Sequence, residues 1–308
     1  MNDDFFKSCV NDIVLGNNVE VLAKFPNDCI DLTVTSPPYD NIRNYNKKID
    51  TTQKLIGRYS FPFEELAQQL YRVTKMGGMV VWVVNDQVIN GNGGGSTKSG
   101  NSFRQALYFQ QIGFNIHDTM IYQKPGIRFP DSTRYHQGFE YMFVFSKGKS
   151  KSINLIKDRK NKTFDRFKTK ETTRQLRKKD DILIKNTNVG FDDNVLKEFG
   201  VRYNIWEICV EHSTGRDITE FNWHPAVFPS ILAHDHIISW SKEGDIVLDP
   251  FSGSGTTSIQ AKITKRKYIG LEINKEYVEK SKKIIDGYAI AENKFLNKEG
   301  VLEEFITF

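Results

Sequence analysis

The chain has 308 residues, of which 39% are hydrophobic and 26% charged, and its formal net charge at pH 7 is +5. These values are typical of a globular protein with enough surface to bury a core. The acidic start, Met1-Asn2-Asp3-Asp4, does not resemble a signal peptide, and no apolar run is long enough to cross a bilayer. We therefore expect a cytoplasmic protein with no membrane partner.

The cysteine content and the modest positive charge limit the kinds of protein that this chain can be. The three cysteines, Cys9, Cys29 and Cys209, are widely separated and odd in number, which argues against a disulfide framework and against a cysteine-based zinc site. We expect buried thiols in a reducing compartment. The net charge of +5 is compatible with a polyanionic partner but does not require one.

The first third of the chain predicts a short helix at residues 18–22 and a buried strand at residues 30–34. The segment Thr35-Ser36-Pro37-Pro38-Tyr39 follows. Its two prolines lack backbone donors and fix φ, so the segment continues neither a helix nor a central strand. The result is a stiff ledge carrying a hydroxyl, free carbonyls and a ring. Alone, it is also compatible with a purely structural turn.

Residues 40–60 form a long polar and aromatic connection without a clear period, which is typical of a lid or of a disordered segment. Residues 63–73 have helical spacing, and we expect that helix to stop at Gly77-Gly78. Residues 79–84 are almost continuously apolar, as in a strand covered on both faces. The order strand, helix, strand predicts an α/β sheet.

The middle of the chain begins with a glycine-rich stretch, residues 91–101, which we interpret as a flexible loop. A helix at 102–111 and strands at 115–123 and 141–145 follow, and the two strands are suited to a hairpin at the sheet edge. From residue 146 the composition changes, because residues 147–185 contain fifteen lysines and arginines. Such a run is either a solvated tether or a surface that neutralises phosphates, and composition does not separate the two.

The last third returns to the α/β pattern, with a helix at 230–240 and strands at 244–250 and 267–273. His224, His234 and His236 have no Cys or Glu at ligand spacing, so we expect no metal site. Glycines at the turn after the first strand, and an acid at the end of the second, indicate a nucleoside cofactor. The turn lacks the Gly-Lys-Ser/Thr of a P-loop, which disfavours a nucleotide triphosphatase.

Two motifs give the chain a specific resemblance. The stretch Asp249-Pro250-Phe251-Ser252-Gly253-Ser254-Gly255-Thr256-Thr257 resembles the S-adenosyl-L-methionine (AdoMet) motif of amino-group DNA methyltransferases, and Thr35–Tyr39 resembles their catalytic motif. The catalytic motif precedes the basic region and the AdoMet motif follows it, as in the β-group of that family. One departure is Gly16-Asn17, where the family often has Gly-Asp.

The resemblance implies an AdoMet-dependent methyltransferase fold, a Rossmann-like mixed sheet of seven strands with an inserted target-recognition region. It divides the chain into a catalytic part at 1–150, the recognition region at 151–222 and an AdoMet-binding part at 223–308. Residues 40–60 would be a lid that closes on DNA.

The resemblance also assigns residues to roles. Ser36, Pro37, Pro38 and Tyr39 are the catalytic residues. The AdoMet-binding residues are Thr35, His224, Pro225, Asp249, Pro250, Phe251, Ser252, Gly253, Gly255, Thr256 and Glu272. Contacts with DNA are expected from Arg43, Lys47, Arg174 and Arg177.

The implied reaction moves a methyl group from AdoMet to an amino group of a base flipped out of double-stranded DNA. Family members that methylate cytosine N4 mostly have Ser at the position of Ser36, and those that methylate adenine N6 mostly have Asp or Asn. We therefore favour cytosine N4 and keep adenine N6 as the alternative. An AdoMet-fold protein that binds DNA without catalysis is a remoter alternative, as is an RNA or protein methyltransferase. We expect a prokaryotic or phage-encoded enzyme. The recognition sequence, a partner restriction endonuclease and the choice between monomer and homodimer are left open.

Overall fold

The computed structural model describes residues 2–38, 62–90, 95–124, 133–161, 175–177, 183–185, 197–208 and 229–295. The chain divides into two compact units. Unit 1 comprises Met1–Asn154 and Asn204–Phe308, and unit 2 comprises Leu155–Tyr203.

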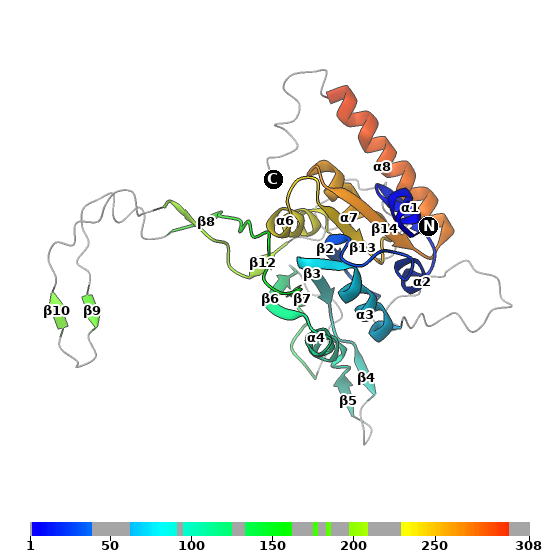
Figure 1. Cartoon of the computed structure of the whole chain (residues 1–308). Helices are drawn as coiled ribbons and strands as arrows, with labels where there is room; N and C mark the ends of the chain where they lie inside the picture. The colour runs from blue at the N-terminus through cyan, green and yellow to red at the C-terminus, as the bar shows by residue number, and fades with distance from the viewer. Residues whose placement is uncertain are drawn as a thin grey trace. The chain divides into compact units, whose positions relative to one another are not determined.

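The described part of unit 1 contains one eight-stranded sheet (Figure 1). All strands run in one direction except β7, which is antiparallel to both of its neighbours. In spatial order the strands are β1 (Asp12–Leu15), β14 (Lys267–Glu272), β13 (Ile246–Asp249), β2 (Ile30–Thr35), β3 (Thr74–Val84), β7 (Phe139–Ser146), β6 (Asn115–Gln123) and β12 (Ile205–Glu207). The predicted Rossmann-like mixed sheet is confirmed. It has eight strands rather than seven, because the three residues of β12 pair in parallel with β6.

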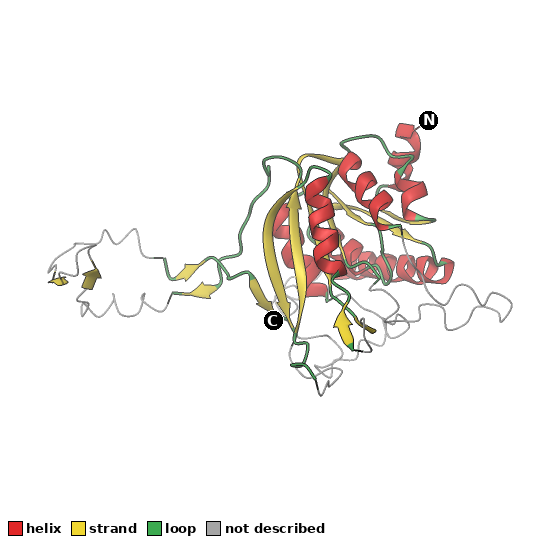
Figure 2. Ribbon diagram, turned by 90° about the horizontal axis from the view of Figure 1, so that it is seen from below, coloured by secondary structure: helices red, strands yellow, loops and turns green. Residues whose placement is uncertain are grey.

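Helices cover both faces of this sheet (Figure 2). One face carries α1 (Asn2–Cys9), α2 (Asn18–Leu22), α3 (Phe63–Val73) and α4 (Asn101–Gln111), and the other carries α6 (Ser230–Trp240), α7 (Thr256–Ile263) and α8 (Lys275–Phe295). Leu66, Leu70 and Phe109 pack on the first face with Trp82 of β3. Leu232 of α6 packs on the second face among the apolar residues of β2. The two apolar clusters hold the helix layers on the sheet.

Two predictions about glycine-rich stretches are wrong. The helix α3 ends at Val73, and β3 then continues through Gly77-Gly78. Lys147 explains this, because its ammonium group donates to the carbonyls of Tyr71 and Thr74, where the helix becomes a strand. Likewise, residues 91–101 are not simply a loop, since β5 (Ser96–Lys98) pairs with β4 (Val88–Asn90) as an antiparallel hairpin; residues 91–94 lie outside the described part.

Other predictions concern the sheet edge, the thiols and the membrane. The strands β6 and β7 pair antiparallel as predicted, but β12 covers β6, so this hairpin does not form the edge. Cys9 and Cys29 are buried and free, and Cys209 lies outside the described residues. No described helix combines the length and apolar character needed to span a bilayer.

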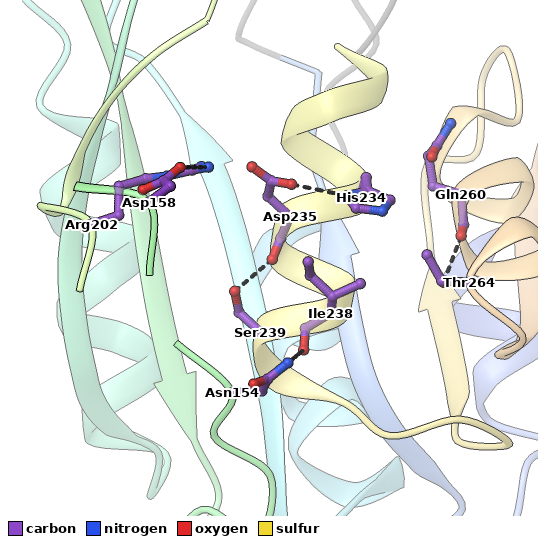
Figure 3. Close-up of polar contacts among 9 residues, drawn as sticks. All are labelled: Asn154, Asp158, Arg202, His234, Asp235, Ile238, Ser239, Gln260 and Thr264. Carbon is purple, nitrogen blue, oxygen red and sulfur yellow. Dashed lines mark hydrogen bonds and ion pairs between the residues drawn. The ribbon is translucent and has the colours of Figure 1, made fainter. Parts of the chain in front are cut away.

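Unit 2 contains two antiparallel strand pairs. The strand β8 (Arg159–Lys160) pairs with β11 (Phe199–Gly200), and β9 (Gln175–Arg177) pairs with β10 (Leu183–Lys185). Beside the first pair, the side-chain amide of Asn161 donates to the carbonyl of Lys197 at 2.7 Å. Asp158 and Arg202 form an ion pair at its base (Figure 3).

Candidate functional site

The carboxyl ends of four adjacent parallel strands meet at one edge of the sheet. β1, β14, β13 and β2 end there at or just before Gly16, Glu272, Asp249 and Thr35. The amide of Gly16 donates to the carbonyl of Glu272 at 2.9 Å, so the first two strand ends are in contact. This edge is where ligands bind in open α/β sheets.

The ledge begins where β2 leaves the sheet. Thr35 is the last residue of β2 and lies opposite Trp82 of β3. Pro37 is buried, whereas Ser36 and Pro38 are partly buried. Neither proline can donate to a neighbouring strand, which ends the ladder at this point and directs the chain out of the sheet. Tyr39 lies outside the described residues.

Asp249 joins the two motifs. Its Oδ1 accepts a hydrogen bond of 2.6 Å from the hydroxyl of Thr35 and one of 3.0 Å from the amide of Phe251. The Thr257 hydroxyl, at the start of α7, donates to the carbonyl of Val34 at 3.5 Å and also interacts with Asp249. Burial raises the pKa of the Asp249 carboxyl, and these hydrogen bonds oppose the rise. The carboxylate therefore ties the ledge, the glycine turn and the α7 helix together.

The glycine turn packs closely against β14. Ser252 donates its amide to the carbonyl of Leu271 at 2.9 Å. A Cβ at Gly270 would lie 2.5 Å from the Ser252 Oγ, so only glycine fits there. Gly255 has φ of +82° and precedes α7, a conformation that favours glycine. The turn thus passes close to the backbone of β14 and leads directly into the first amides of α7.

Glu272 ends β14 beside this turn. Its two carboxylate oxygens accept hydrogen bonds of 2.9 Å from the amides of Gly253 and Asn274. Burial raises the pKa of Glu272, the two amides oppose the rise, and the nearby Asp249 adds to it. Each oxygen keeps a second lone pair, so the carboxylate can still accept hydrogen bonds from two adjacent hydroxyls.

These residues fit a nucleoside cofactor such as AdoMet. The acid offers acceptors for a ribose, and the glycines leave room for a close approach. The Ser252 hydroxyl is buried and has no hydrogen-bond partner among the described residues, so one polar atom in the turn is available.

The structure brings together Thr35, Ser36, Pro37, Pro38, Asp249, Pro250, Phe251, Ser252, Gly253, Gly255, Thr256 and Glu272 at this edge. The hydroxyl of Thr256 contacts that of Ser254 at 3.0 Å. Tyr39, Arg43, Lys47, Arg174, His224 and Pro225 lie outside the described residues. Arg177 belongs to β9, but its side chain is not described.

Two residues near the site, Asn18 and Ile273, were not predicted from the sequence. Asn18 donates its side-chain amide to the carbonyl of Pro250 at 3.2 Å, which connects α2 to the turn. Ile273 follows Glu272 and is 54% exposed. The only feature of the sequence that could have indicated it is that an apolar residue directly follows the acid. Asn17, which stands where the resemblance led us to expect Asp, caps α2 by accepting a hydrogen bond from the amide of Val19 at 2.9 Å.

The histidines on α6 have structural partners. His234 Nδ1 lies 2.9 Å from Asp235 Oδ1 (Figure 3). His236 is buried between the Met142 sulfur, at 3.2 Å, and the indole nitrogen of Trp240, at 3.1 Å. The described residues contain no cluster of His, Cys, Asp and Glu that could hold a metal ion.

Comparison with known proteins identifies relatives along most of the chain. The N6/N4 methyltransferase family model, described as DNA methylase, matches residues 30–283. The orphan methyltransferase M.BamHII of Bacillus amyloliquefaciens is 53% identical over 273 residues, which are 88% of this chain and 94% of the relative. Among solved structures, the cytosine-N4-specific PvuII DNA methyltransferase has a TM-score of 0.57 at 20% identity and covers 87% of this chain and 84% of its own. The M1.HpyAVI–SAM complex has a TM-score of 0.51 at 18% identity, with 88% of this chain and 97% of its own covered. At these identities the two structures show a shared fold.

Proposed function

Because this chain belongs to the N6/N4 family of DNA methylases, we propose that it transfers a methyl group from AdoMet to N4 of cytosine in duplex DNA. The observation that carries the proposal is the hydrogen bond between Thr35 and Asp249, which joins the Ser-Pro-Pro ledge to the glycine turn. A methyl donor bound at the glycine turn and an amino group bound at the ledge would meet between these two segments. AdoMet supplies an electrophilic methyl group on a sulfonium.

On the cofactor side, Glu272 would accept hydrogen bonds from the ribose hydroxyls, and the exposed Ile273 would pack on the adenine ring. Gly253 and Gly255 would leave room for the cofactor, and Phe251, whose ring centre is 6.4 Å from that of Trp82, would contact it from the turn. His224 and Pro225 are proposed to border the methionine end.

On the DNA side, the target base is turned out of the duplex at a cost of a few kcal/mol. Stacking on Tyr39 offsets about 1–3 kcal/mol of this cost. The amino group of a base is conjugated with its ring and is a poor nucleophile. Hydrogen bonds from it to the Ser36 hydroxyl and the Pro37 carbonyl favour a pyramidal nitrogen and direct its lone pair toward the methyl group. Positioning and electrostatics then carry the catalysis.

Cytosine is favoured because Ser36 stands where relatives that methylate adenine mostly have Asp or Asn. Adenine N6 is the second candidate, since a serine hydroxyl can also accept a hydrogen bond from the adenine amino group. A protein that binds DNA without catalysis would not need the ledge, and Ser36-Pro37-Pro38 is intact.

Target recognition is proposed for residues 151–222, which include unit 2. A two-stranded antiparallel ribbon can enter the major groove, and the strand pairs β8–β11 and β9–β10 have that form. The basic residues of the region, with Arg174 and Arg177 among them, would neutralise phosphates. Arg43 and Lys47 would contribute from the segment after the ledge.

The test is to incubate the protein with tritiated AdoMet and mixed-sequence duplex DNA, digest the DNA and separate the nucleosides. We expect label in N4-methylcytosine. Label in N6-methyladenine would overturn the choice of cytosine, and no label in DNA would overturn both candidates. Pairing with a restriction endonuclease is a separate prediction, checked by challenging the methylated DNA with an endonuclease encoded beside this chain's gene.

A further inference from the structure

A second surface lies at the same edge of the sheet as the ledge. We define the edge platform as residues 88–90, 95–98 and 133–138, which are the β4–β5 hairpin and the segment that leads into β7. β3 runs parallel to β2, with Thr35 opposite Trp82, and antiparallel to β7, with Val84 opposite Tyr141. The end of β3 and the start of β7 therefore lie beside the ledge. Strand spacing puts the start of β7 about 10 Å from β2.

The edge platform is held by hydrogen bonds between its two parts. Lys98 donates to the Gln137 side chain at 2.7 Å, and Arg134 donates to the Ser96 hydroxyl at 2.9 Å. The amide of Lys124 donates to the carbonyl of Gly138 at 2.8 Å, which ties the segment to the end of β6. The segment before β7 thus has a defined position before any ligand binds.

Tyr135 is the most exposed large hydrophobic side chain of the edge platform. Its relative exposure is 101%, so the whole ring is presented to solvent, although aromatic rings usually bury most of their surface. Its neighbour His136 is exposed, and Arg134 is partly exposed. The platform sequence contains Lys98, Arg134 and His136 and no acidic residue. An exposed ring within a basic setting matches nucleic acid, in which phosphates surround stacked bases.

We propose that the edge platform binds the duplex next to the flipped nucleotide, with the Tyr135 ring stacked in the gap that the base leaves. Lys98, Arg134 and His136 face the flanking phosphates. Side chains inserted between bases are an established way to hold a distorted duplex. The ring replaces stacking that the extruded base has lost, so it favours the open duplex. This inference rests on the proposed function, because only an enzyme that extrudes a base creates such a gap.

The test compares the wild-type protein with Tyr135→Ala, Tyr135→Phe and Leu107→Ala. Leu107 is a matched control, since it is 61% exposed but lies on α4 outside the edge platform. The readouts are AdoMet affinity by calorimetry and the single-turnover rate of methyl transfer to mixed-sequence duplex DNA. We expect Tyr135→Ala to slow transfer about tenfold, as loss of one base–aromatic stack predicts. Tyr135→Phe and Leu107→Ala should stay within about twofold of the wild type, and all variants should bind AdoMet equally.

A Tyr135→Ala rate within about twofold of the wild type would overturn the proposal. Equal losses in Tyr135→Ala and Tyr135→Phe would also overturn it, because the hydroxyl rather than the ring would then be responsible. A wild-type protein that binds AdoMet but methylates no DNA would instead overturn the proposed function, and the role of Tyr135 with it.

Discussion

The hydroxyl of Thr35 donates a hydrogen bond of 2.6 Å to Asp249 Oδ1, and this contact joins residues that are 214 positions apart. Both residues stand at the ends of neighbouring parallel strands, where Leu248 pairs with Thr33. Beyond that pair, the two strands are joined by the side-chain hydrogen bond between Thr35 and Asp249. One buried carboxylate therefore joins the ledge to the glycine turn.

Replacing Thr35 by valine tests this link, since valine keeps the shape and removes the hydroxyl. The buried Asp249 would lose one donor that stabilises its ionised form, which costs about 1–3 kcal/mol. We expect a lower melting temperature and a lower rate of methyl transfer. Thr35→Ser keeps the hydroxyl and should retain most of both. Equal melting curves for Thr35→Val and the wild type would contradict a structural role for the contact.

AdoMet binding should weaken on acidification through Glu272. Burial raises the pKa of this carboxyl above 4.5, so it takes up a proton at a pH where an exposed glutamate is still ionised. Protonation removes acceptors for the ribose hydroxyls, and affinity should fall as the pH drops through the raised pKa. In the free protein, acidification has the opposite effect on folding stability. The folded state holds the proton on Glu272 more tightly than the unfolded state does, so this group stabilises the folded protein at low pH. That contribution is lost as the pH rises from 4.5 through the raised pKa.

Calorimetric titration with AdoMet between about pH 5 and pH 8 measures the affinity. Glu272→Gln should bind more weakly and with a shallower pH dependence. Burial also raises the pKa of Asp249, so this residue can contribute to a dependence that remains. An unchanged slope in Glu272→Gln would show that Glu272 does not titrate in this range.

Gly270→Ala should disturb the cofactor turn without a change in charge. The added Cβ would lie 2.5 Å from the Ser252 Oγ and 3.0 Å from its Cβ, so the turn must shift. We expect about tenfold weaker AdoMet binding, measured by calorimetry, and a loss of about 1–3 kcal/mol in stability. Gly287→Ala on α8 is the matched control, because nothing lies within 4 Å of its added Cβ, and it should be neutral or slightly stabilising. Similar affinities in the two variants would refute the close-packing argument.

Local patterns predicted the elements that carry the site. The apolar runs of β2, β13 and β14 and the glycine turn between the last two are visible in the sequence because each strand is buried on both faces. That β2 and β13 are neighbours was not predicted, since periodicity carries no information about which strands pair. The bond from Asn18 to Pro250 has no sequence signature, because it joins distant segments through one amide.

Short elements and helix ends were less predictable for a physical reason. Strands β1 and β12 have four and three residues, too few to show an alternating pattern. The end of α3 is set by Lys147, which lies 73 residues beyond Thr74 and binds its carbonyl. A tertiary contact of this kind overrides the local signal of Gly77-Gly78, which alone suggested that the helix continued further.

Shortening unit 2 should separate cofactor binding from DNA methylation. A variant that replaces residues 164–195 by Asn-Gly can close as a hairpin, because Asn161 already contacts Lys197 across β8 and β11. We expect calorimetry to give unchanged AdoMet affinity, while methyl transfer to duplex DNA is lost. A shortened protein that still methylates the same DNA sites would overturn the assignment of recognition to this region.

Ser36→Ala tests the chemistry of the ledge. The substitution removes the acceptor proposed for the amino group, at a partly buried position where alanine fits. Loss of one positioned hydrogen-bonding group typically lowers the rate about 100–1,000-fold, and we expect a fall of this order in single-turnover methyl transfer. AdoMet affinity should not change, because Ser36 faces the base rather than the cofactor in the proposed mechanism. Ser36→Asn, which supplies one of the two residue types expected in adenine-specific members of the family, should retain part of the activity. Full activity in Ser36→Ala would show that the Pro37 carbonyl alone orients the amino group.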